Sequence, residues 1–409
     1  MLFGAGNIGR SFIAELFASA GYEVVFVDIN ETVVNELNRR GGYDVVIKHP
    51  DGTDEVLPVR GVRAVNAAES QAVTAEVAEA DIAATAVGSG ALTSVAKLIG
   101  AGMVERRRRR PDDPLDVILA ENVRDAASVV REGVRVGLPD AARGDAAVEG
   151  ALLGLVQTSI GKMVPIVPAE VTARDPLVVF AEPYDTLIVD AKGFRGELPP
   201  VDRIKAVDDI RAYVDRKLFL HNLGHAAVAY LGFRADPAVT LIADALAIEP
   251  VREGAARAMS ESAAALATYP SLSLADLHEH RDDLLARFAN RALGDTVFRV
   301  GRDLPRKLAR DDRLVGAMLL AARGGLPFAA IGEVFLAALR FAATDESGKR
   351  FPPDEEVVRL AESRGAEAVL KTVSGLRAGE PEDERVIATV AATTSFSARK
   401  EVDRGVWEK

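Results

Sequence analysis

Apolar and polar residues follow strand-like and helix-like spacings in turn along the first half of the chain. Leu2-Phe3 is a short apolar run before a glycine-rich segment, and the residues after that segment have helical spacing. Residues 23–27 are apolar and β-branched and end in Asp28, and residues 31–40 have the spacing of a second helix. Strands that alternate with helices predict a doubly wound, mostly parallel α/β sheet of the Rossmann type.

The same half contains further strand patterns. Residues 82–87 and 115–119 are continuous apolar runs, which is typical of buried parallel strands. Residues 43–48 and 55–59 alternate and are separated by the turn sequence at 50–53, so we expect a hairpin there.

The second half has a different pattern, because apolar residues after Pro199-Pro200 recur mainly with helical spacing. The expected helices span residues 204–231, 238–247, 251–268, 274–293, 313–322, 326–343 and 355–375. We therefore predict a dinucleotide-binding domain over residues 1–196 and a mostly α-helical domain over residues 197–409, which would carry the substrate and catalytic residues.

Charge and composition exclude several classes of function. The chain of 409 residues has 50 Lys and Arg against 61 Asp and Glu, a net charge of −11, which argues against nucleic acid or an anionic membrane as partner. The arginines at 106–110 are expected to form a solvated surface run and not a polyanion site. The chain has no cysteine, which excludes disulfides, thiolate metal sites and Cys nucleophiles.

The location is expected to be cytoplasmic. The first residues show no basic leader before an apolar stretch, so no signal peptide is expected. Residues 82–104 are apolar enough to suggest a membrane span, but Lys97 and the turn signal at 88–90 favour a strand followed by a helix.

A G-x-G-x-x-G motif stands at the first predicted strand-to-helix junction. One glycine allows a tight turn, one lets the backbone approach a pyrophosphate, and one lets helix and strand pack closely. The carboxylate at the end of the next strand suits the ribose hydroxyls and repels a 2′-phosphate, so NAD is favoured over NADP. The expected cofactor-binding residues are Gly4, Gly6, Asn7, Ile8, Gly9 and Asp28. Only three residues precede Gly4, so the first strand is either truncated or begins upstream of this start.

Three polar side chains converge on one predicted helix of the second half. At about 100° per residue, Asn222 lies about 140° and His225 about 80° from Lys217 around the helix. From the residues alone, a satisfied polar cluster at a domain interface explains them as well as catalysis does. His221, one turn from both Lys217 and His225, is either a packing neighbour or a group that supports them.

These residues carry a resemblance to a known family. The pattern K-L-x3-N-x2-H, together with F-G-A-G-N-I-G-R at the start, resembles the polyol-specific long-chain dehydrogenases of the mannitol dehydrogenase family. Further matching segments occur in the expected order, at residues 120–122, 165–168, 182–183, 299–308 and 312–317, and the likeness extends to about residue 392.

The resemblance implies a role for each residue of the motif. Lys217 would be the general base that removes the hydroxyl proton, and Asn122 and Asn222 would donate hydrogen bonds to the developing alkoxide without a metal. His225 would bind and orient a substrate hydroxyl. Val214 stands where the family often has a carboxylate, so proton exchange would use Asp215 or a chain of waters.

The family also uses an arginine and a lysine eight residues apart to contact the substrate, which Arg299 and Lys307 match by spacing. Four cations fall within nine residues there, and such a cluster suits a sugar phosphate. The expected substrate-binding residues are Arg299, Arg302, Arg306 and Lys307. The alternative is that two of the four face solvent or pair with Asp303 and Asp311.

The resemblance therefore implies an NAD-dependent enzyme that interconverts D-mannitol 1-phosphate and D-fructose 6-phosphate, acts on a small sugar phosphate, and works as a monomer or homodimer. A related hexitol or hexuronate dehydrogenase is the main alternative, and a non-catalytic NAD(H)-binding regulator is a distant one. Two competing motifs are set aside. The Y-x3-K sequence from Tyr213 lies outside the predicted nucleotide domain, and adjacent residues of His278-Glu279-His280 point different ways on a helix.

Overall fold

The computed structural model describes residues 1–139, 142–145 and 150–407. The chain forms two compact units, Met1–Val214 and Asp215–Lys409. The first contains a Rossmann-like, mostly parallel sheet and the second is helical, so the predicted fold class is confirmed. The sequence placed the domain boundary near residue 196, whereas the units divide at 214, because the strand after Pro199-Pro200 still belongs to the sheet of the first unit.

The large sheet has eight strands in the order β11-β10-β8-β7-β6-β1-β2-β5. Its strands are β1 (Leu2–Phe3), β2 (Val24–Asp28), β5 (Val62–Asn66), β6 (Ala83–Thr85), β7 (Leu115–Leu119), β8 (Leu153–Ser159), β10 (Leu187–Asp190) and β11 (Ile204–Val207). All neighbouring pairs are parallel except β8 with β10. The carboxyl ends of β1, β2, β6 and β7 therefore meet at one edge, where ligands of open α/β sheets bind.

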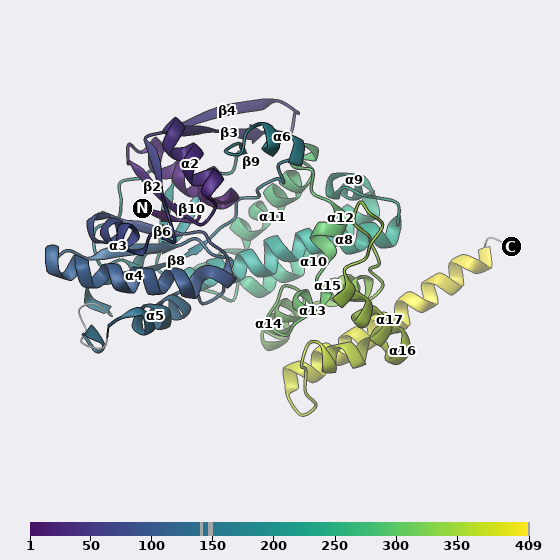
Figure 1. Cartoon of the computed structure of the whole chain (residues 1–409). Coiled ribbons are helices and arrows are strands. Elements are labelled where there is room, and N and C mark those ends of the chain that lie inside the picture. Colours follow the sequence, from purple (N-terminus) through teal and green to yellow (C-terminus); the bar gives the residue numbers. More distant parts are fainter. Residues whose placement is uncertain (140–141, 146–149, 408–409) are drawn as a thin grey trace. The chain divides into compact units, whose positions relative to one another are not determined.

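Helices cover both faces of this sheet (Figure 1). One face packs against α3 (Ser70–Glu79), α4 (Ser89–Arg109) and α5 (Ala126–Gly137). The other face packs against η1 (Gly9–Ala14), α1 (Glu15–Ser19) and α2 (Glu31–Arg40). Leu2 and Phe3 enter opposite cores, as successive residues of a strand must. The predicted strand and helix over 82–104 are thus confirmed, and no helix among the described residues has the length and hydropathy to cross a bilayer.

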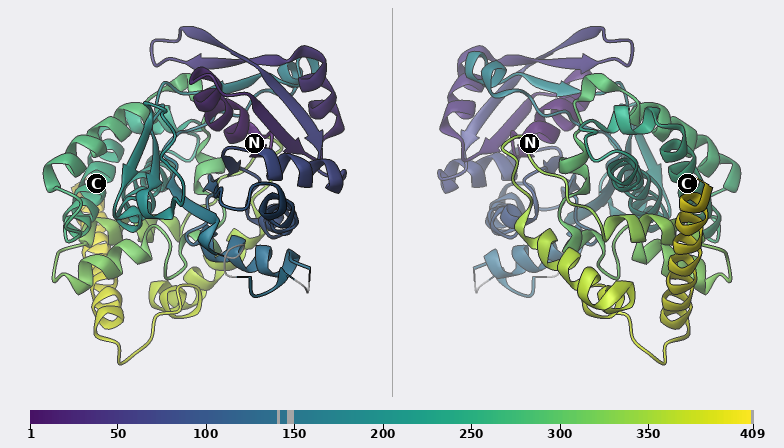
Figure 2. Two further views of the ribbon diagram at one scale, coloured as in Figure 1. Left: turned by 90° about the vertical axis from the view of Figure 1, so that its left-hand side faces the viewer. Right: turned by 90° about the vertical axis from the view of Figure 1, so that its right-hand side faces the viewer.

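A second, three-stranded sheet completes the first unit (Figure 2). Its order is β4-β3-β9, with β3 (Gly42–Lys48), β4 (Asp54–Arg60) and β9 (Val179–Ala181). The antiparallel pairing of β3 with β4 confirms the predicted hairpin. Between β8 and β9 lies the short helix α6 (Ala169–Arg174).

The second unit is built from helices of widely different length, which pack around α8 and α10 (Figure 1). The helices from the boundary onward are α7 (Ile210–Arg216), η5 (Lys217–Asn222), α8 (Leu223–Ala235), α9 (Ile242–Ala247), α10 (Glu249–Leu266), α11 (Leu274–Phe288), α12 (Val297–Gly301), α13 (Leu304–Lys307), α14 (Val315–Arg323), α15 (Ala329–Ala338), α16 (Pro352–Thr372) and α17 (Pro381–Trp407). The prediction of a helix from residue 204 was wrong, because Ile204–Val207 pairs in parallel with β10.

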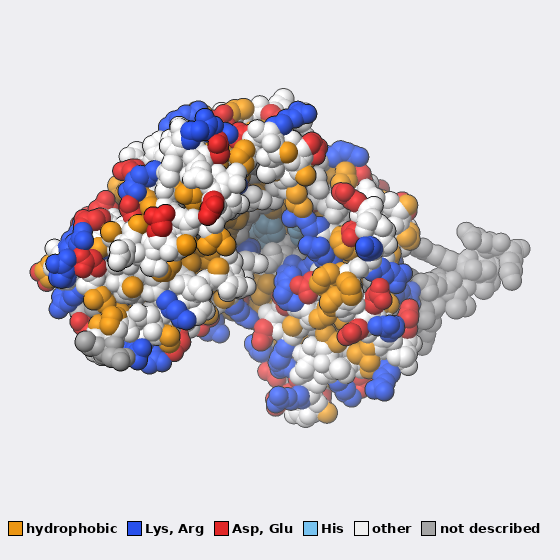
Figure 3. Space-filling view, in the orientation of Figure 1, with side chains coloured by type: hydrophobic (Ala, Val, Ile, Leu, Met, Phe, Trp, Pro, Cys, Tyr) orange, Lys and Arg blue, Asp and Glu red, His pale blue; other side chains and the backbone are white. Residues whose placement is uncertain are grey.

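The arginine run at the end of α4 is only partly the solvated surface that we predicted. Arg107, Arg108 and Arg109 are exposed, and Figure 3 shows Lys and Arg side chains interspersed with Asp and Glu at this end of the helix. Arg106, however, is 1% exposed. Its guanidinium donates to the backbone carbonyls of Ala78, Ala80, Asp113 and Pro114. It therefore ties α3 to the segment before β7, and its prediction as a solvated residue was wrong.

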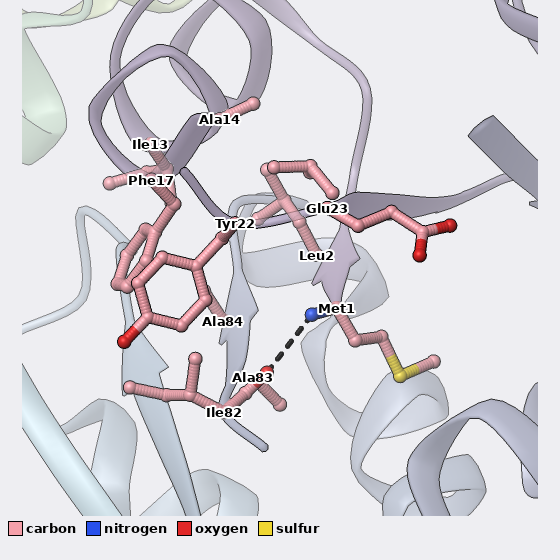
Figure 4. Close-up of a pocket in the computed structure, with 11 residues that line it drawn as sticks. Met1, Leu2, Ile13, Ala14, Phe17, Tyr22, Glu23, Ile82, Ala83 and Ala84 are labelled. Atoms are coloured by element: carbon pink, nitrogen blue, oxygen red, sulfur yellow. Dashed lines mark hydrogen bonds between the residues drawn. The ribbon is translucent and has the colours of Figure 1, made fainter. Parts of the chain in front are cut away.

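A small apolar pocket lies at the start of β1, at the opposite end of the strand from the glycine turn (Figure 4). The pocket is lined by Ile13 of η1, by Phe17 of α1 and by Ile82, which precedes β6. The Met1 amine donates to the Ile82 carbonyl at 2.9 Å, and burial lowers the pKa of this amine to about 6. None of the predicted site residues lines this pocket, so it is not part of the candidate site.

Candidate active site

The glycine turn after β1 is shaped by close backbone contacts. Gly4 has φ 96°, a conformation that L side chains rarely adopt, and a Cβ there would overlap the carbonyl of Ala86. A Cβ on Gly9 would overlap the carbonyl oxygen of Gly4. A Cβ on Gly6 would meet no atom within 4 Å, so the space in front of this residue is open. Two of the glycines thus hold the turn in place, and the third leaves room for a ligand.

Asp28 at the end of β2 is fixed beside this turn. Its Oδ2 accepts the backbone N–H of Ala5 at 2.7 Å, and its Oδ1 accepts that of Asn30 at 2.9 Å. Both oxygens keep further lone pairs for other donors, such as the hydroxyls of a ribose. The carboxylate is therefore in the position that the NAD prediction requires, and a carboxylate there would repel a 2′-phosphate.

Asn122 follows β7 at the same edge of the sheet and is exposed. The residue before it, Glu121, is 7% exposed and binds the loop after β6. Its two oxygens accept the backbone N–H groups of Val87 at 2.9 Å and Gly88 at 2.8 Å. Glu121 thus joins the ends of β6 and β7, and Asn122 stands on this joined edge of the first unit.

Lys217 and Asn222 are the two ends of a π-helical turn, η5, where the sequence predicted an uninterrupted α-helix. A π-turn has i→i+5 hydrogen bonds, which bring residues five apart to the same side of the helix. Neighbouring helices hold η5 tightly. The hydroxyl of Ser262 donates to the Phe219 carbonyl at 2.6 Å, and a Cβ on Gly316 would lie 2.6 Å from the Phe219 ring. The π-turn therefore aligns Lys217 with Asn222 better than an α-helix would.

The amine of Lys217 is adapted to take up a proton near neutral pH. Burial, and to a smaller extent the positive charge of the Arg313 guanidinium, lower its pKa to about 8. A general base works best when its pKa lies close to the working pH. His221, a turn away, is buried, and burial lowers its pKa well below the usual range, so this imidazole is neutral.

His225 is oriented by an aromatic ring and a carboxylate. Its ring stacks on Phe288 with centroids 4.7 Å apart and planes 7° apart. Its Nε2 lies 3.3 Å from Oδ2 of Asp295, a residue that is 8% exposed. The other carboxylate oxygen of Asp295 forms an ion pair with Arg299. Asp295 therefore brings His225 and Arg299 together in the second unit.

The remaining cations of the predicted substrate cluster have other contacts. Lys307 is 4% exposed, and its amine donates to the carbonyls of Val300, at 2.6 Å, and Arg302. Burial, with smaller effects of the positive charges of Arg313 and Arg306, lowers the pKa of Lys307 to about 7. In this arrangement the Lys307 amine closes the turn between α12 and α13.

Arg302 and Arg306 lie at the surface. The Arg302 guanidinium is 5.5 Å from the Phe298 ring centroid and 5.9 Å from that of Phe351. Arg306 donates to Asp303 at 2.5 Å, which is one of the two pairings that the sequence left open.

Asp215 is 1% exposed and accepts a hydrogen bond from the Tyr269 hydroxyl at 2.6 Å. Proton exchange through Asp215 or through a chain of waters stays a prediction.

Comparisons with known proteins agree with this geometry. A family model described as the mannitol dehydrogenase Rossmann domain matches residues 1–203, and one described as the mannitol dehydrogenase C-terminal domain matches residues 209–397. The chain belongs to the mannitol dehydrogenase family. The resemblance seen in the sequence is thus confirmed at the level of the family. The predicted NAD cofactor is confirmed with it, because the Rossmann domain contains the turn and the carboxylate that NAD requires.

Two solved structures of similar fold extend over nearly the whole chain. D-sorbitol dehydrogenase in substrate-free form has a TM-score of 0.75 and 18% identity, covering 95% of this chain and 91% of that chain. Mannitol 2-dehydrogenase from Pseudomonas fluorescens, in a ternary complex with NAD and D-mannitol, has a TM-score of 0.71 and 16% identity, covering 98% and 94%. At these identities the two structures show a shared fold.

Three residues of this mannitol dehydrogenase family member have site contacts that the sequence did not assign to them. Glu121 and Arg313 lie in segments that match the family, but neither was given a role, because their partners are distant in sequence. Asp295 stands four residues before Arg299, a spacing at which opposite charges meet on a helix. That spacing was the one available signal, and it was missed.

Proposed function

We propose that the protein is a mannitol-1-phosphate 5-dehydrogenase, which interconverts D-mannitol 1-phosphate and D-fructose 6-phosphate with NAD. The observation that carries the proposal is the amine of Lys217, with a pKa lowered to about 8, aligned with Asn222 on a π-turn in a chain of the mannitol dehydrogenase family. The chemistry is the oxidation of a secondary alcohol, for which one base and one set of alkoxide donors suffice.

In the proposed oxidation, the neutral amine of Lys217 accepts the proton of the reacting hydroxyl. The carboxamides of Asn122 and Asn222 donate hydrogen bonds to the oxygen as negative charge develops on it. His225 binds a neighbouring hydroxyl, with its ring held by Phe288 and Asp295. Arg299, which is held by the other carboxylate oxygen of Asp295, contacts the substrate. The buried amine of Lys307 binds the Val300 carbonyl and so keeps the segment that carries Arg299 folded.

The cofactor would be held by the glycine turn and Asp28. The open space before Gly6 accommodates the pyrophosphate, and the Asp28 carboxylate accepts hydrogen bonds from the adenosine ribose. Bound NAD supplies the hydride acceptor for the oxidation.

A second substrate class, the unphosphorylated hexitols or hexuronates, is favoured by one observation. Arg302 stacks on two aromatic rings and Arg306 pairs with Asp303, so these two cations are engaged without any phosphate. Two proteins of the same fold are named as sorbitol and mannitol 2-dehydrogenases, which fits this alternative.

Steady-state kinetics decides between the two classes. We expect kcat/KM for mannitol 1-phosphate to exceed that for mannitol and altronate by at least about a hundredfold, because charge-assisted bonds to a phosphate contribute about 1.5–3 kcal/mol each. Equal values for the phosphate ester and the free polyol would exclude the phosphate preference. An absence of any change in NADH absorbance over a panel of polyols and sugar phosphates would favour a non-catalytic regulator instead.

A further inference from the structure

We propose that Arg313 is a specificity-determining residue that binds the phosphate group of the substrate. The inference rests on the proposed function, because it assigns the phosphate of that substrate to one side chain. Arg313 was not among the cations that the sequence suggested for this role. It lies two positions before the first residue of α14, in the second unit.

The packing of α14 places this arginine next to the catalytic turn. The ideal Cβ position on Gly316 lies 2.6 Å from Cε1 of Phe219, so only a glycine allows α14 to approach η5 this closely. Phe219 is two residues after Lys217 on η5. The residues at the start of α14, and Arg313 just before it, are thereby brought against the turn that carries the base.

The environment of Arg313 is that of an anion-binding group. The residue is 8% exposed, and its Nε donates to Oδ1 of Asp312 at 2.7 Å. The other oxygen of Asp312 lies 3.7 Å from Arg306, so one carboxylate is shared by two guanidiniums. Among the residues that the structure describes, no hydrogen bond is made by the two terminal nitrogens of Arg313. A nearly buried guanidinium with both terminal nitrogens available presents the forked donor pair that a phosphate accepts.

Arg313 lies near other basic side chains as well as near Asp312. Its guanidinium lowers the pKa of Lys217 and that of Lys307, so its positive charge acts on both amines. A dianionic phosphate bound here would be attracted by these groups together. The other candidate cations are less suitable, because the Lys307 amine is bonded to two carbonyls and Arg302 and Arg306 are exposed.

The test compares Arg313→Gln and Arg313→Lys with Arg323→Gln. Arg323 is an exposed cation at the last residue of α14, whereas Arg313 lies just before the first, so replacing Arg323 removes the same charge at the opposite end of this helix. The assay measures kcat and KM for mannitol 1-phosphate and for mannitol, as limiting values at high pH where the Lys217 amine is deprotonated in every variant. Inhibition of mannitol oxidation by inorganic phosphate is measured in parallel.

We expect Arg313→Gln to reduce kcat/KM for mannitol 1-phosphate by about 10- to 100-fold, mostly through KM, and to change that for mannitol by less than about threefold. Arg313→Lys should recover part of the loss, because it keeps the charge but not the fork. Inhibition by phosphate should weaken in Arg313→Gln and persist in Arg323→Gln.

The two possible failures are distinct. If the wild-type enzyme does not prefer the phosphate ester, the proposed function fails. If the wild type prefers it and Arg313→Gln retains both that preference and the inhibition by phosphate, the proposed function stands and the role of Arg313 is refuted. An equal loss for both substrates would also refute it, since a purely structural residue would act on both alike.

Discussion

The candidate residues fall into two halves, a cofactor half in the first unit and a catalytic half in the second, and the two halves are built by different means. In the first unit the cofactor half depends on backbone, because the positive φ of Gly4 and the contact of Gly9 with the Gly4 carbonyl fix the turn. In the second unit the predicted catalytic half depends on side chains, and the pKa of Lys217 is lowered to about 8 chiefly by burial, with a smaller effect of Arg313. A backbone site is thus defined by a short local sequence, whereas a side-chain site depends on contacts that are distant in the chain.

The two halves share one feature, a π-helical turn. In the first unit η1 follows the glycine turn directly, and in the second η5 begins at Lys217. Such turns are rare and are often found at functional sites, because they change the direction of side chains within a helix. In both units, therefore, the helix departs from α-geometry at the residues predicted to act.

The largest effect is expected in the side-chain half. Replacement of the base in Lys217→Met should lower kcat for polyol oxidation by about 10²–10⁴-fold, the usual contribution of a positioned general base. Rates of NADH formation under saturating NAD and substrate measure the loss.

Cofactor binding provides the control for this variant. NADH affinity, measured by fluorescence titration, should stay within about twofold of wild type, because the glycine turn of the first unit does not contain Lys217. Turnover near the wild-type rate in Lys217→Met would show that the base has been misassigned.

The next largest effect should distinguish the roles of Gly6 and Gly9, two glycines of the same turn, in cofactor binding and in stability. Gly6→Ala should leave the free energy of unfolding within about 0.5–1 kcal/mol of wild type, since its Cβ meets no protein atom, but should weaken NADH binding by about tenfold or more. Gly9→Ala should destabilise the protein by about 1–3 kcal/mol even without cofactor, because its Cβ overlaps the Gly4 carbonyl.

Thermal unfolding without cofactor, together with NADH titration, measures both variants. If Gly6→Ala destabilised the free protein as much as Gly9→Ala does, the space before Gly6 would not be a ligand site.

The same contrast explains how much could be predicted from the sequence. The glycine turn, β2 with Asp28 and α2 follow from local signals, and the structure has them at the expected residues. The strand character of Ile204–Val207 was missed, because its pairing with β10 is a tertiary contact. The burial of Arg106 was missed because the carbonyls that bind it come from other segments of the chain.

In the catalytic half, the sequence indicated which residues could act, but not how they are tuned. The roles of Lys217, Asn222 and His225 came from a family resemblance. The π-turn that aligns the first two, and the pair Asp295–Arg299 beside the third, depend on packing between helices. A pKa of about 8 could not be predicted from the spacing of residues, because it arises from burial and from a guanidinium almost a hundred residues away.

The pH dependence of kcat/KM in both reaction directions tests whether Lys217 is the general base. Because the pKa of Lys217 is lowered to about 8, its amine is protonated below that pH and neutral above it. For the free enzyme, kcat/KM for alcohol oxidation should rise about tenfold per pH unit up to about pH 8 and then level off. Ketone reduction needs the protonated amine, so its kcat/KM should be level below pH 8 and fall above it. Profiles in both directions that lack a common inflection near pH 8 would contradict Lys217 as the proton carrier.

The smallest effect concerns Asp295, which we expect to act as a positioning residue for His225 and Arg299. Asp295→Asn keeps the shape of the side chain but removes the charge that pairs with Arg299, so both groups should lose their fixed orientation. We expect KM for the polyol substrate to rise about five- to tenfold, from a charge-assisted contact, while kcat changes by less than about threefold. The control is Asp283→Asn, which removes an exposed carboxylate that pairs with Arg287 on α11. A purely structural role would lower Tm in Asp295→Asn without this division between KM and kcat, and that result would contradict the positioning role.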